Sequence, residues 1–313
     1  MTTAHRISKL FPALGTFNEI TAFGPDCSPA LERAEARVRE LHARWSVFDP
    51  DSEISRLNKS AGQGPVPIGA DTLSVLLAAK RMAAWSDGTF TVTARPLTAL
   101  WNIGPEGQGA VPERQALVRA RALARDADLI LDERGCTAAL RRRGEAVDLG
   151  GIAKGYAADE VRRILREGGV ERAIINLGGT VIAMGEERTV GIQHPRQRTG
   201  IAMGQLRVRD QAVVTSGDYE RWFEQGGRRY CHILDPRTGE SARSGLCAVT
   251  AVGESAMELD ALTTAIFVLG AERGMALARR AGAEVLLVTD GLDVLCSDGL
   301  RDRFTPETNY YTM

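Results

Sequence analysis

The sequence predicts an α+β fold with a mostly antiparallel sheet and packed helices. Helical patterns and short apolar runs interleave along the chain, but they lack the regular β-α-β alternation of a parallel sheet. From residue 173 to about 235, short strand-like runs follow one another with turns between them. No internal repeat, low-complexity stretch or linker interrupts the 313 residues, so we expect a single domain over 1–313.

Composition and charge exclude several classes of protein. The chain is 44% apolar and 25% charged, as in a globular protein, and its formal net charge is -1. No overall basic field attracts nucleic acid or an anionic membrane, so we expect neither as a partner. The five cysteines are scattered and form no C-x-x-C pair, which indicates reduced thiols and argues against a disulfide framework or a zinc site.

The N-terminal sequence carries two basic residues but no apolar run long enough for a signal peptide. Nothing downstream approaches the roughly 20 apolar residues of a membrane span. We therefore expect a cytoplasmic protein.

The first half of the chain predicts strands and helices in alternation. After a frayed start, residues 14–23 alternate loosely and indicate a strand. Ser28 is expected to cap a helix with Pro29 at its first position. The expected buried face of this helix contains Leu31, Val38, Leu41 and Trp45.

Two further helices and a strand are expected before residue 146. Asp71 is placed to cap a helix that runs to about Ser86. Pro112 is expected to start another, which ends within 123–126. Residues 128–135 then indicate a strand that enters a hairpin turn.

The stretch 146–159, A-V-D-L-G-G-I-A-K-G-Y-A-A-D, predicts a short strand, a tight turn and a helix N-terminus. Gly150 and Gly151 lack a Cβ and allow a ligand or backbone to approach. The first amides of the helix and Lys154 suit an anion, and Asp148 can orient a polar group or hold a cation. A structural alternative is that the glycines serve helix packing and Lys154 is solvated.

The second half continues with short strands and ends with two helices. The first helix after residue 152 is expected to close at Gly168 and Gly169. Ser255 is expected to cap a helix over 256–269, and a second helix covers 271–281. The expected strands lie at 173–180, 213–219 and 246–252, with a final pair around the D-G turn at 290–291.

Asp260 and Thr264 are four residues apart, so they share one face of the expected helix. Hard oxygen ligands in this spacing suit Mg²⁺, which completes its octahedron with water and phosphate oxygens. The alternative is an ordinary helix acid and a threonine that bonds back to the helix. His232 lies between a strand and a D-P-R-T-G turn, where a structural role is equally open.

Five motifs occur together in register and resemble the ApbE-like family of flavin transferases. They are D-L-G-G-I-A-K-G-Y-A-A-D-E-V at 148–161, I-N-L-G-G-T at 175–180, V-T-S-G-D-Y-E-R-W-F at 214–223, H-I-L-D-P-R-T-G at 232–239 and D-A-L-T-T-A at 260–265. The motif-bearing part extends over about 14–300. The resemblance implies a compact, two-lobed fold and the transfer of FMN from FAD onto a hydroxyl of another protein.

The resemblance also implies roles for individual residues. His232 falls at the position of the catalytic histidine, whose task is to accept the proton of the attacking hydroxyl. The metal positions are Asp260, Thr264 and the backbone carbonyl of Gly151, with Thr263 a weaker candidate. The implied FAD-contacting positions are Leu14, Phe48, Thr89, Phe90, Thr91, Asp148, Lys154, Ser216, Gly217, Asp218 and Ile233.

The chain departs from the family pattern on the side expected to hold the flavin. Phe48 stands where relatives often have tyrosine, so its ring can stack but cannot donate a hydrogen bond. Thr91 replaces the usual aspartate, and Val92 stands where proline is common.

We therefore expect a Mg²⁺-dependent FAD:protein FMN transferase, with Mn²⁺ as a possible substitute. FAD is its substrate, a flavin-accepting protein its partner, and AMP its second product. Two alternatives stay open at this point. The same residues serve a FAD pyrophosphatase, and the changes at 48, 91 and 92 are compatible with a flavin-binding protein without turnover.

Overall fold

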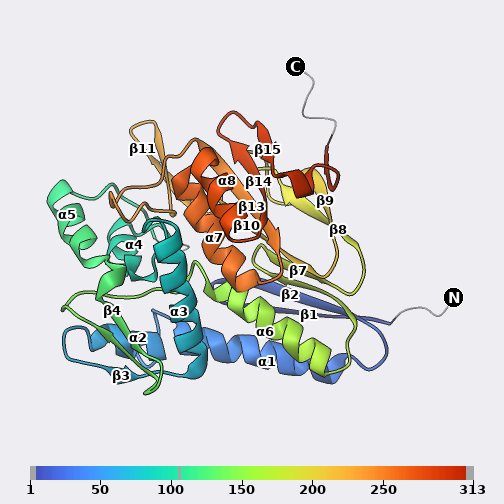
Figure 1. Cartoon of the computed structure of the whole chain (residues 1–313), viewed down its shortest axis with the longest axis horizontal. Coiled ribbons are helices and arrows are strands. Elements are labelled where there is room, and N and C mark those ends of the chain that lie inside the picture. The colour runs from blue at the N-terminus through green and yellow to red at the C-terminus, as the bar shows by residue number, and fades with distance from the viewer. Residues whose placement is uncertain (1–4, 105–106, 308–313) are drawn as a thin grey trace.

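An eight-stranded antiparallel sheet forms the centre of the molecule (Figure 1). The computed structural model describes residues 5–104 and 107–307. In spatial order the strands are β1 (Arg6–Ala13), β2 (Thr16–Phe23), β6 (Arg172–Leu177), β7 (Thr180–Met184), β10 (Gln211–Gly217), β13 (Leu246–Gly253), β14 (Glu284–Thr289) and β15 (Val294–Cys296). Every neighbouring pair is antiparallel, which confirms the predicted fold class.

Four helices cover one face of this sheet (Figure 1). They are α1 (Ser28–Trp45), α6 (Ala153–Glu167), α7 (Ala256–Leu269) and α8 (Ala271–Arg280). A three-stranded sheet of β8 (Arg188–Gln193), β9 (Ala202–Val208) and β16 (Phe304–Pro306) packs on the other face. Because β13 is covered on both faces, seven of its eight residues are buried, and Thr250 is the one polar side chain among them.

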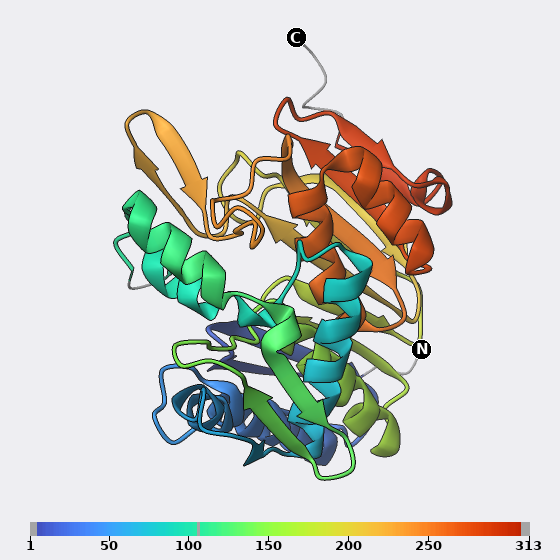
Figure 2. The same cartoon turned by 60° about the vertical axis from the view of Figure 1, so that its left-hand side comes forward.

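Residues 46–145 form a second, helix-rich lobe at the left of Figure 1. Its elements are α2 (Glu53–Lys59), β3 (Val66–Pro67), α3 (Ala70–Trp85), the 3₁₀ turns η1 (Val92–Ala94) and η2 (Asp126–Asp128), α4 (Arg95–Trp101), α5 (Arg114–Leu123), β4 (Leu129–Asp132) and β5 (Thr137–Leu140). A hairpin of β11 (Trp222–Gln225) and β12 (Arg228–Cys231) projects beside α5 (Figure 2). Trp101 and Tyr230 join the hairpin to this lobe, with ring centroids 5.5 Å apart.

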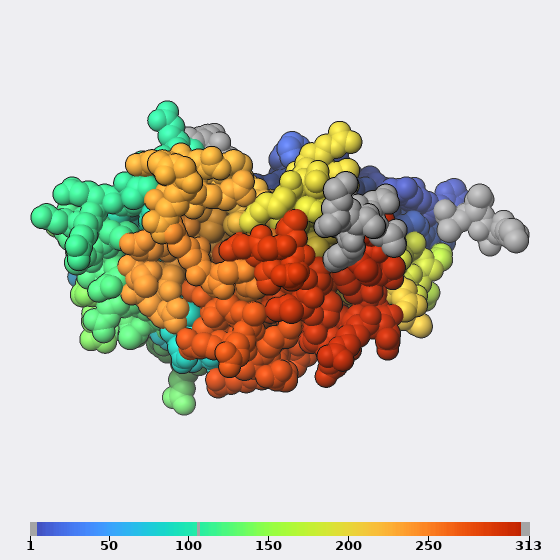
Figure 3. Space-filling model, turned by 90° about the horizontal axis from the view of Figure 1, so that it is seen from above, coloured from blue at the N-terminus to red at the C-terminus, as the bar shows by residue number. Residues whose placement is uncertain are grey.

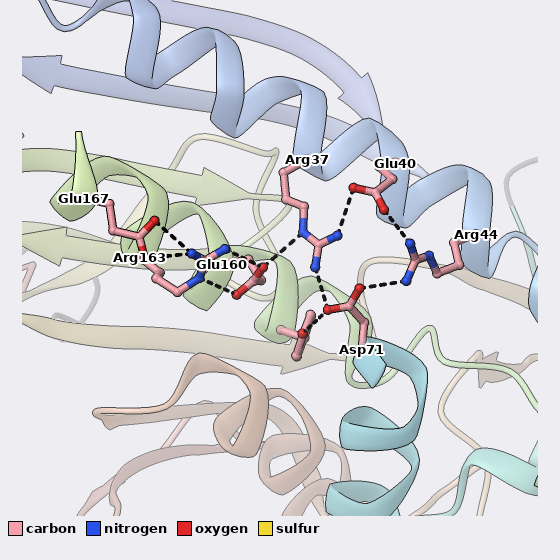
Figure 4. Close-up of polar contacts among 8 residues, drawn as sticks. Arg37, Glu40, Arg44, Asp71, Glu160, Arg163 and Glu167 are labelled. Carbon is pink, nitrogen blue, oxygen red and sulfur yellow. Dashed lines mark hydrogen bonds and ion pairs between the residues drawn. The ribbon is translucent and has the colours of Figure 1, made fainter. Parts of the chain in front are cut away.

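A charged network ties α1, α3 and α6 together (Figure 4). Asp71 accepts from Arg37 at 2.5 Å, from Arg44 at 2.8 Å and from the Tyr156 hydroxyl at 2.6 Å. The expected cap by Asp71 is therefore wrong, because Gly69 precedes the helix and no side chain caps it. The Asp71 carboxylate instead links three helices, one of which carries the glycine turn of residues 150–152.

Several expected boundaries also differ from the structure. Residues 6–13, expected to be frayed, form β1, and β2 begins at Thr16 because Leu14 and Gly15 make the turn between them with positive φ. Cys27, not Ser28, precedes α1, and no side chain caps that helix. The third helix begins at Arg114, two residues after Pro112.

The end of the chain adds elements that were not expected. The 3₁₀ turn η3 (Asp298–Leu300) leads into β16, and β16 pairs with β9. Within the described part of the chain, no helix is both long and apolar enough to cross a membrane.

Candidate active site at the junction of helices α6 and α7

The segment before α6 is extended but does not belong to a sheet, so the strand expected at its start is wrong. Side-chain and loop groups make the hydrogen bonds that a neighbouring strand would make in a sheet. Val147 N donates to Asn58 Oδ1 at 2.7 Å, and Asn58 Nδ2 donates to Val147 O at 3.0 Å. Asp148 N donates to Val92 O at 2.8 Å. The helical lobe thereby fixes the glycine turn from outside, satisfying backbone groups that a strand would have paired.

Helices α6 and α7 approach each other closely, and Gly155 permits this. A Cβ at Gly155 would overlap the carbonyl group of Ala256, which is backbone and cannot rotate away. One turn later, Asp159 accepts from Ala256 N at 3.1 Å and from Met257 N at 3.0 Å. The carboxylate of α6 therefore supplements the predicted cap by Ser255, which accepts from Glu258 N.

This contact places Asp260 against the N-terminal turn of α6. Asp260 is only 3% exposed, and its Oδ2 accepts from Gly155 N at 3.0 Å. The Lys154 ammonium lies 3.4 Å from Asp260 Oδ1 and 3.3 Å from Gly150 O. Lys154 is thus held inside the site and is not a solvated surface lysine. The close helix packing is made at Gly155, whereas a Cβ at Gly150 would meet Asp148 and one at Gly151 would meet the Phe90 ring.

Three hydroxyl groups extend the site toward the end of β10. Ser216 Oγ lies 2.9 Å from Thr263 Oγ1 and 3.5 Å from Thr264 Oγ1. Both threonines bond back to the carbonyl of Asp260, at 3.0 and 3.4 Å. A Cβ at Gly151 would lie 3.8 Å from Thr264 Oγ1, so the glycine turn is the neighbour of this hydroxyl. Residues separated by about a hundred positions therefore converge.

The donor set of this junction fits a hard divalent cation. Asp260 supplies a carboxylate, Thr264 a hydroxyl, and the turn at Gly150 and Gly151 supplies backbone carbonyls. A cationic group, the Lys154 ammonium, already lies between the Asp260 carboxylate and Gly150 O. Within residues 5–104 and 107–307, no cluster of three His, Cys, Asp or Glu side chains can hold a metal. A metal here would take its other ligands from water and phosphate oxygens, as Mg²⁺ does.

His232 directly follows β12, and the carbonyl of Arg221 holds it in place. His232 N donates to Arg221 O at 3.0 Å, and the ring Nδ1 lies 3.3 Å from the same oxygen. Because a carbonyl only accepts, this contact favours a proton on Nδ1 and leaves Nε2 as an acceptor. Burial, followed by the charges of Arg221 and Lys154, lowers the pKa of His232 to about 4. His232 is therefore neutral near pH 7, and the neighbouring Ile233 is buried.

Phe48 marks an exposed part of the site. Its side chain is 84% exposed, and the Arg95 guanidinium lies over its ring, 5.5 Å from the centroid. Arg95 also lies 3.8 Å from Asp148 Oδ2, whose other oxygen accepts from Gly150 N at 2.9 Å. Sequence reasoning missed Arg95, since an arginine beside a proline at a helix start carries no distinguishing signal.

The predicted flavin residues at 89–91 lie beneath the glycine turn. Thr89 and Phe90 are 1% and 4% exposed, and Thr89 Oγ1 donates to Ala265 O at 3.3 Å. The Phe90 ring lies 3.2 Å from the Cβ position of Gly151. Thr91 is half-buried and bonds to Thr93 at 2.8 Å. In this structure Thr89 and Phe90 support the turn from inside the core.

Three other predicted residues lie around the β10 and β1–β2 ends. Asp218 forms a two-bond ion pair with Arg196 at 2.6 and 2.9 Å, so its carboxylate is already engaged. Gly217 gives room to the ring of Tyr219. Leu14 has a φ of 53° in the β1–β2 turn, and its N–H donates to His42 Nδ1 at 3.2 Å.

Comparison with known proteins agrees with this architecture. The sequence profile of the ApbE family matches residues 14–287. A protein of Klebsiella pneumoniae (strain 342) named FAD:protein FMN transferase is 40% identical over 286 residues, which is 90% of each chain. A protein of the same name from Vibrio cholerae is 33% identical over 85% of this chain and 79% of its own.

Solved structures show the same fold. The ApbE protein of Thermotoga maritima superposes with a TM-score of 0.87 at 30% identity, over 94% of this chain and 98% of that one. Flavin transferase ApbE from Vibrio cholerae gives a TM-score of 0.86 at 30% identity, over 96% and 99%. With its profile match and its close relatives, the chain belongs to the ApbE family.

Proposed function

We propose that this chain is a Mg²⁺-dependent transferase that moves FMN from FAD to a threonine or serine hydroxyl of a partner protein and releases AMP. The observation that carries the proposal is the convergence of Lys154, Asp260 and Thr264 at the α6–α7 junction, with a neutral His232 within range of the Lys154 charge. Relatives that share most of the chain are named FAD:protein FMN transferase.

In the proposed reaction, the acceptor hydroxyl attacks the phosphorus of the FMN half of FAD. His232 accepts the hydroxyl proton on Nε2, a phosphoester forms, and the bond to the AMP phosphate breaks with its electrons leaving on AMP. The low pKa keeps His232 unprotonated over the physiological range, so the base is ready without prior deprotonation. Placed proton acceptors of this kind contribute about 10² to 10⁴ in rate.

The remaining residues position the substrate and balance its charge. The Lys154 ammonium offers positive charge to an anion, whereas the amides of Ala153 and Gly155 already donate to Leu149 O and Asp260 Oδ2. Asp260, Thr264 and the carbonyl of Gly151 would hold Mg²⁺, or Mn²⁺ in its place. When bound, the metal supplies Lewis-acid stabilisation of phosphate oxygens. Phe48 offers an exposed ring on which the isoalloxazine can stack.

We place the reaction in the cytoplasm, since all five cysteines are free. Fractionation of the native cell with an antibody to the chain tests it, and recovery outside the cytoplasm would overturn it.

Incubation with FAD and Mg²⁺, with and without an acceptor encoded beside this gene, tests the proposed activity. Transfer predicts that covalent flavin on the acceptor and free AMP rise together and that both depend on the acceptor. Free FMN and AMP without an acceptor would identify a FAD pyrophosphatase. Tight FAD binding with no cleavage under any divalent metal would identify a binding protein.

A further inference from the structure

Arg221 lies beside the candidate base but takes no part in the roles described so far. It follows β10 and directly precedes β11, and its carbonyl accepts from the backbone of His232 and lies next to the ring Nδ1. The two residues are therefore fixed neighbours through the backbone of the hairpin. The Arg221 side chain itself is exposed.

The Arg221 guanidinium has no carboxylate partner among the described residues, unlike the other cations near the site. Lys154 is engaged by Asp260, Arg95 by Asp148 and Arg196 by Asp218. An arginine presents a planar fork of donors that matches the oxygens of a phosphate or carboxylate. Arg221 is thus an uncommitted cation next to a neutral base.

The side chain extends toward the turn between β1 and β2. A Cβ built on Gly15 would lie 3.7 Å from Arg221 Nη2, so the guanidinium lies over this turn. Arg221 also lines a cavity of about 250 Å³ together with Gly107, Gly109, Glu220, Trp222 and Phe223. The space-filling view shows the hairpin segment at the surface, against the segment that contains α4 and α5 (Figure 3).

We infer that Arg221 binds the phosphate of the adenylate half of FAD, the group that leaves as AMP. The inference rests on the proposed function, because it needs the pyrophosphate to lie between His232 and the α6–α7 junction. Lys154 and Asp260 would lie on one side of that bond, and Arg221 is the free cation on the side of the β1–β2 turn. Negative charge grows on the leaving phosphate as the bond breaks, and a guanidinium within reach offsets it.

Measurements of ligand binding test whether Arg221 binds the adenylate phosphate. Arg221→Ala should weaken binding of ADP and of FAD about 10- to 100-fold, as loss of a charged hydrogen bond does, and leave riboflavin binding unchanged. Arg221→Lys should recover part of the loss, because it keeps the charge but not the fork. Arg228→Ala is the matched control, since it removes the same charge from the same hairpin; its guanidinium lies over the Tyr230 ring instead.

Thermal unfolding of each variant should match the wild type, because the Arg221 side chain is exposed. Unchanged ADP and FAD affinities in Arg221→Ala, or equal losses in Arg228→Ala, would overturn the inference. So would a variant that binds ADP normally but needs more acceptor, since Arg221 would then contact the partner protein. If wild-type protein binds ADP through Arg221 yet transfers no flavin, the phosphate site stands and the proposed function fails.

Discussion

The two sides of the candidate site are built in different ways. The side proposed to bind phosphate lies where two helices meet, and backbone groups or buried side chains hold its members, Gly151, Lys154, Gly155, Asp260 and Thr264. The side proposed to bind the flavin lies at the edge of the helical lobe, where Phe48 is 84% exposed, and contains Phe48, Thr91, Arg95 and Asp148. The positions where we expect the sequence to depart from the family pattern, 48, 91 and 92, all fall on or next to the proposed flavin side.

This contrast follows from what each side must do. Stabilising charge on a phosphate requires donors fixed before the substrate arrives, since reorganisation would cost free energy at the moment of reaction. A ring that stacks on a flavin needs area more than exact placement, so an aromatic can change without loss of the contact. We therefore expect changes on the phosphate side to affect stability and turnover, and changes on the flavin side to affect affinity.

The largest effect is expected for His232→Ala, next to the phosphate side. Transfer should fall by about 10² to 10⁴, while FAD and Mg²⁺ affinity stay nearly intact, because the base acts only in the chemical step. Single-turnover transfer and FAD fluorescence quenching, measured on the same preparation, check this. Loss of FAD affinity with normal residual turnover would make His232 a binding residue and weaken the division between the two sides.

Gly155→Ala should reduce the free energy of unfolding by about 3 kcal/mol, at the upper end of the cost of overpacking, because the added methyl meets the backbone of Ala256. Denaturant unfolding measures this loss. Gly191→Ala is the control, since its Cβ would make an ordinary contact of 3.5 Å with Ala202. Equal stability of the two variants would show that the helices do not need this close approach.

Phe48→Ala should weaken FAD binding by about 1 to 2 kcal/mol, the range for losing one stacking platform, and leave unfolding unchanged. The exposed ring makes little contact with the core, so stability has no reason to fall. Titration of FAD quenching gives the dissociation constant. An unaltered constant would place the flavin elsewhere and remove the flavin side from the account.

The smallest expected effect is that of a change in pH near 7 on kcat/KM. Because the pKa of His232 is lowered to about 4, kcat/KM should be flat near neutrality and should rise with pH only around 4. The unfolded chain protonates this histidine near 6.5, so stability is full above that pH and falls as the pH drops toward 4. In Arg221→Ala, the rise of kcat/KM should move to higher pH, because one of the charges that lower the pKa of His232 is gone. A rise of kcat/KM near pH 6.5 in the wild type would contradict the lowered pKa of His232.

The sequence allowed much of the fold to be predicted because its signals were local. The Ser255 cap, the double glycines at 168–169 and 178–179, and the largely apolar run of β13 each specify a boundary or a buried strand through neighbouring residues. The strand expected at 146–148 failed because Asn58 and Val92, far away in sequence, supply its hydrogen bonds. Asp71 failed as a cap for a similar reason, since Arg37 and Arg44 hold its carboxylate.

In the candidate site, too, local features could be predicted from the sequence and contacts between distant segments could not. The spacing of Asp260 and Thr264 placed them on one helix face, and they lie there. The partnership of Lys154 with Asp260, the close approach at Gly155 and the position of Arg95 over Phe48 depend on how separate elements pack. Asp260 is also buried, so Asp260→Ala would leave the Lys154 ammonium without its carboxylate partner and would damage the fold.

Metal dependence in Asp260→Asn therefore tests the central claim most directly, because this variant keeps the shape of the side chain and removes its charge. FAD cleavage by the wild type should saturate with Mg²⁺ in the presence of acceptor. In Asp260→Asn, the Mg²⁺ requirement should rise by at least about tenfold or turnover should vanish, while circular dichroism confirms a folded chain. An Asp260→Asn variant with wild-type turnover and wild-type Mg²⁺ saturation would contradict a phosphate and metal site at the α6–α7 junction.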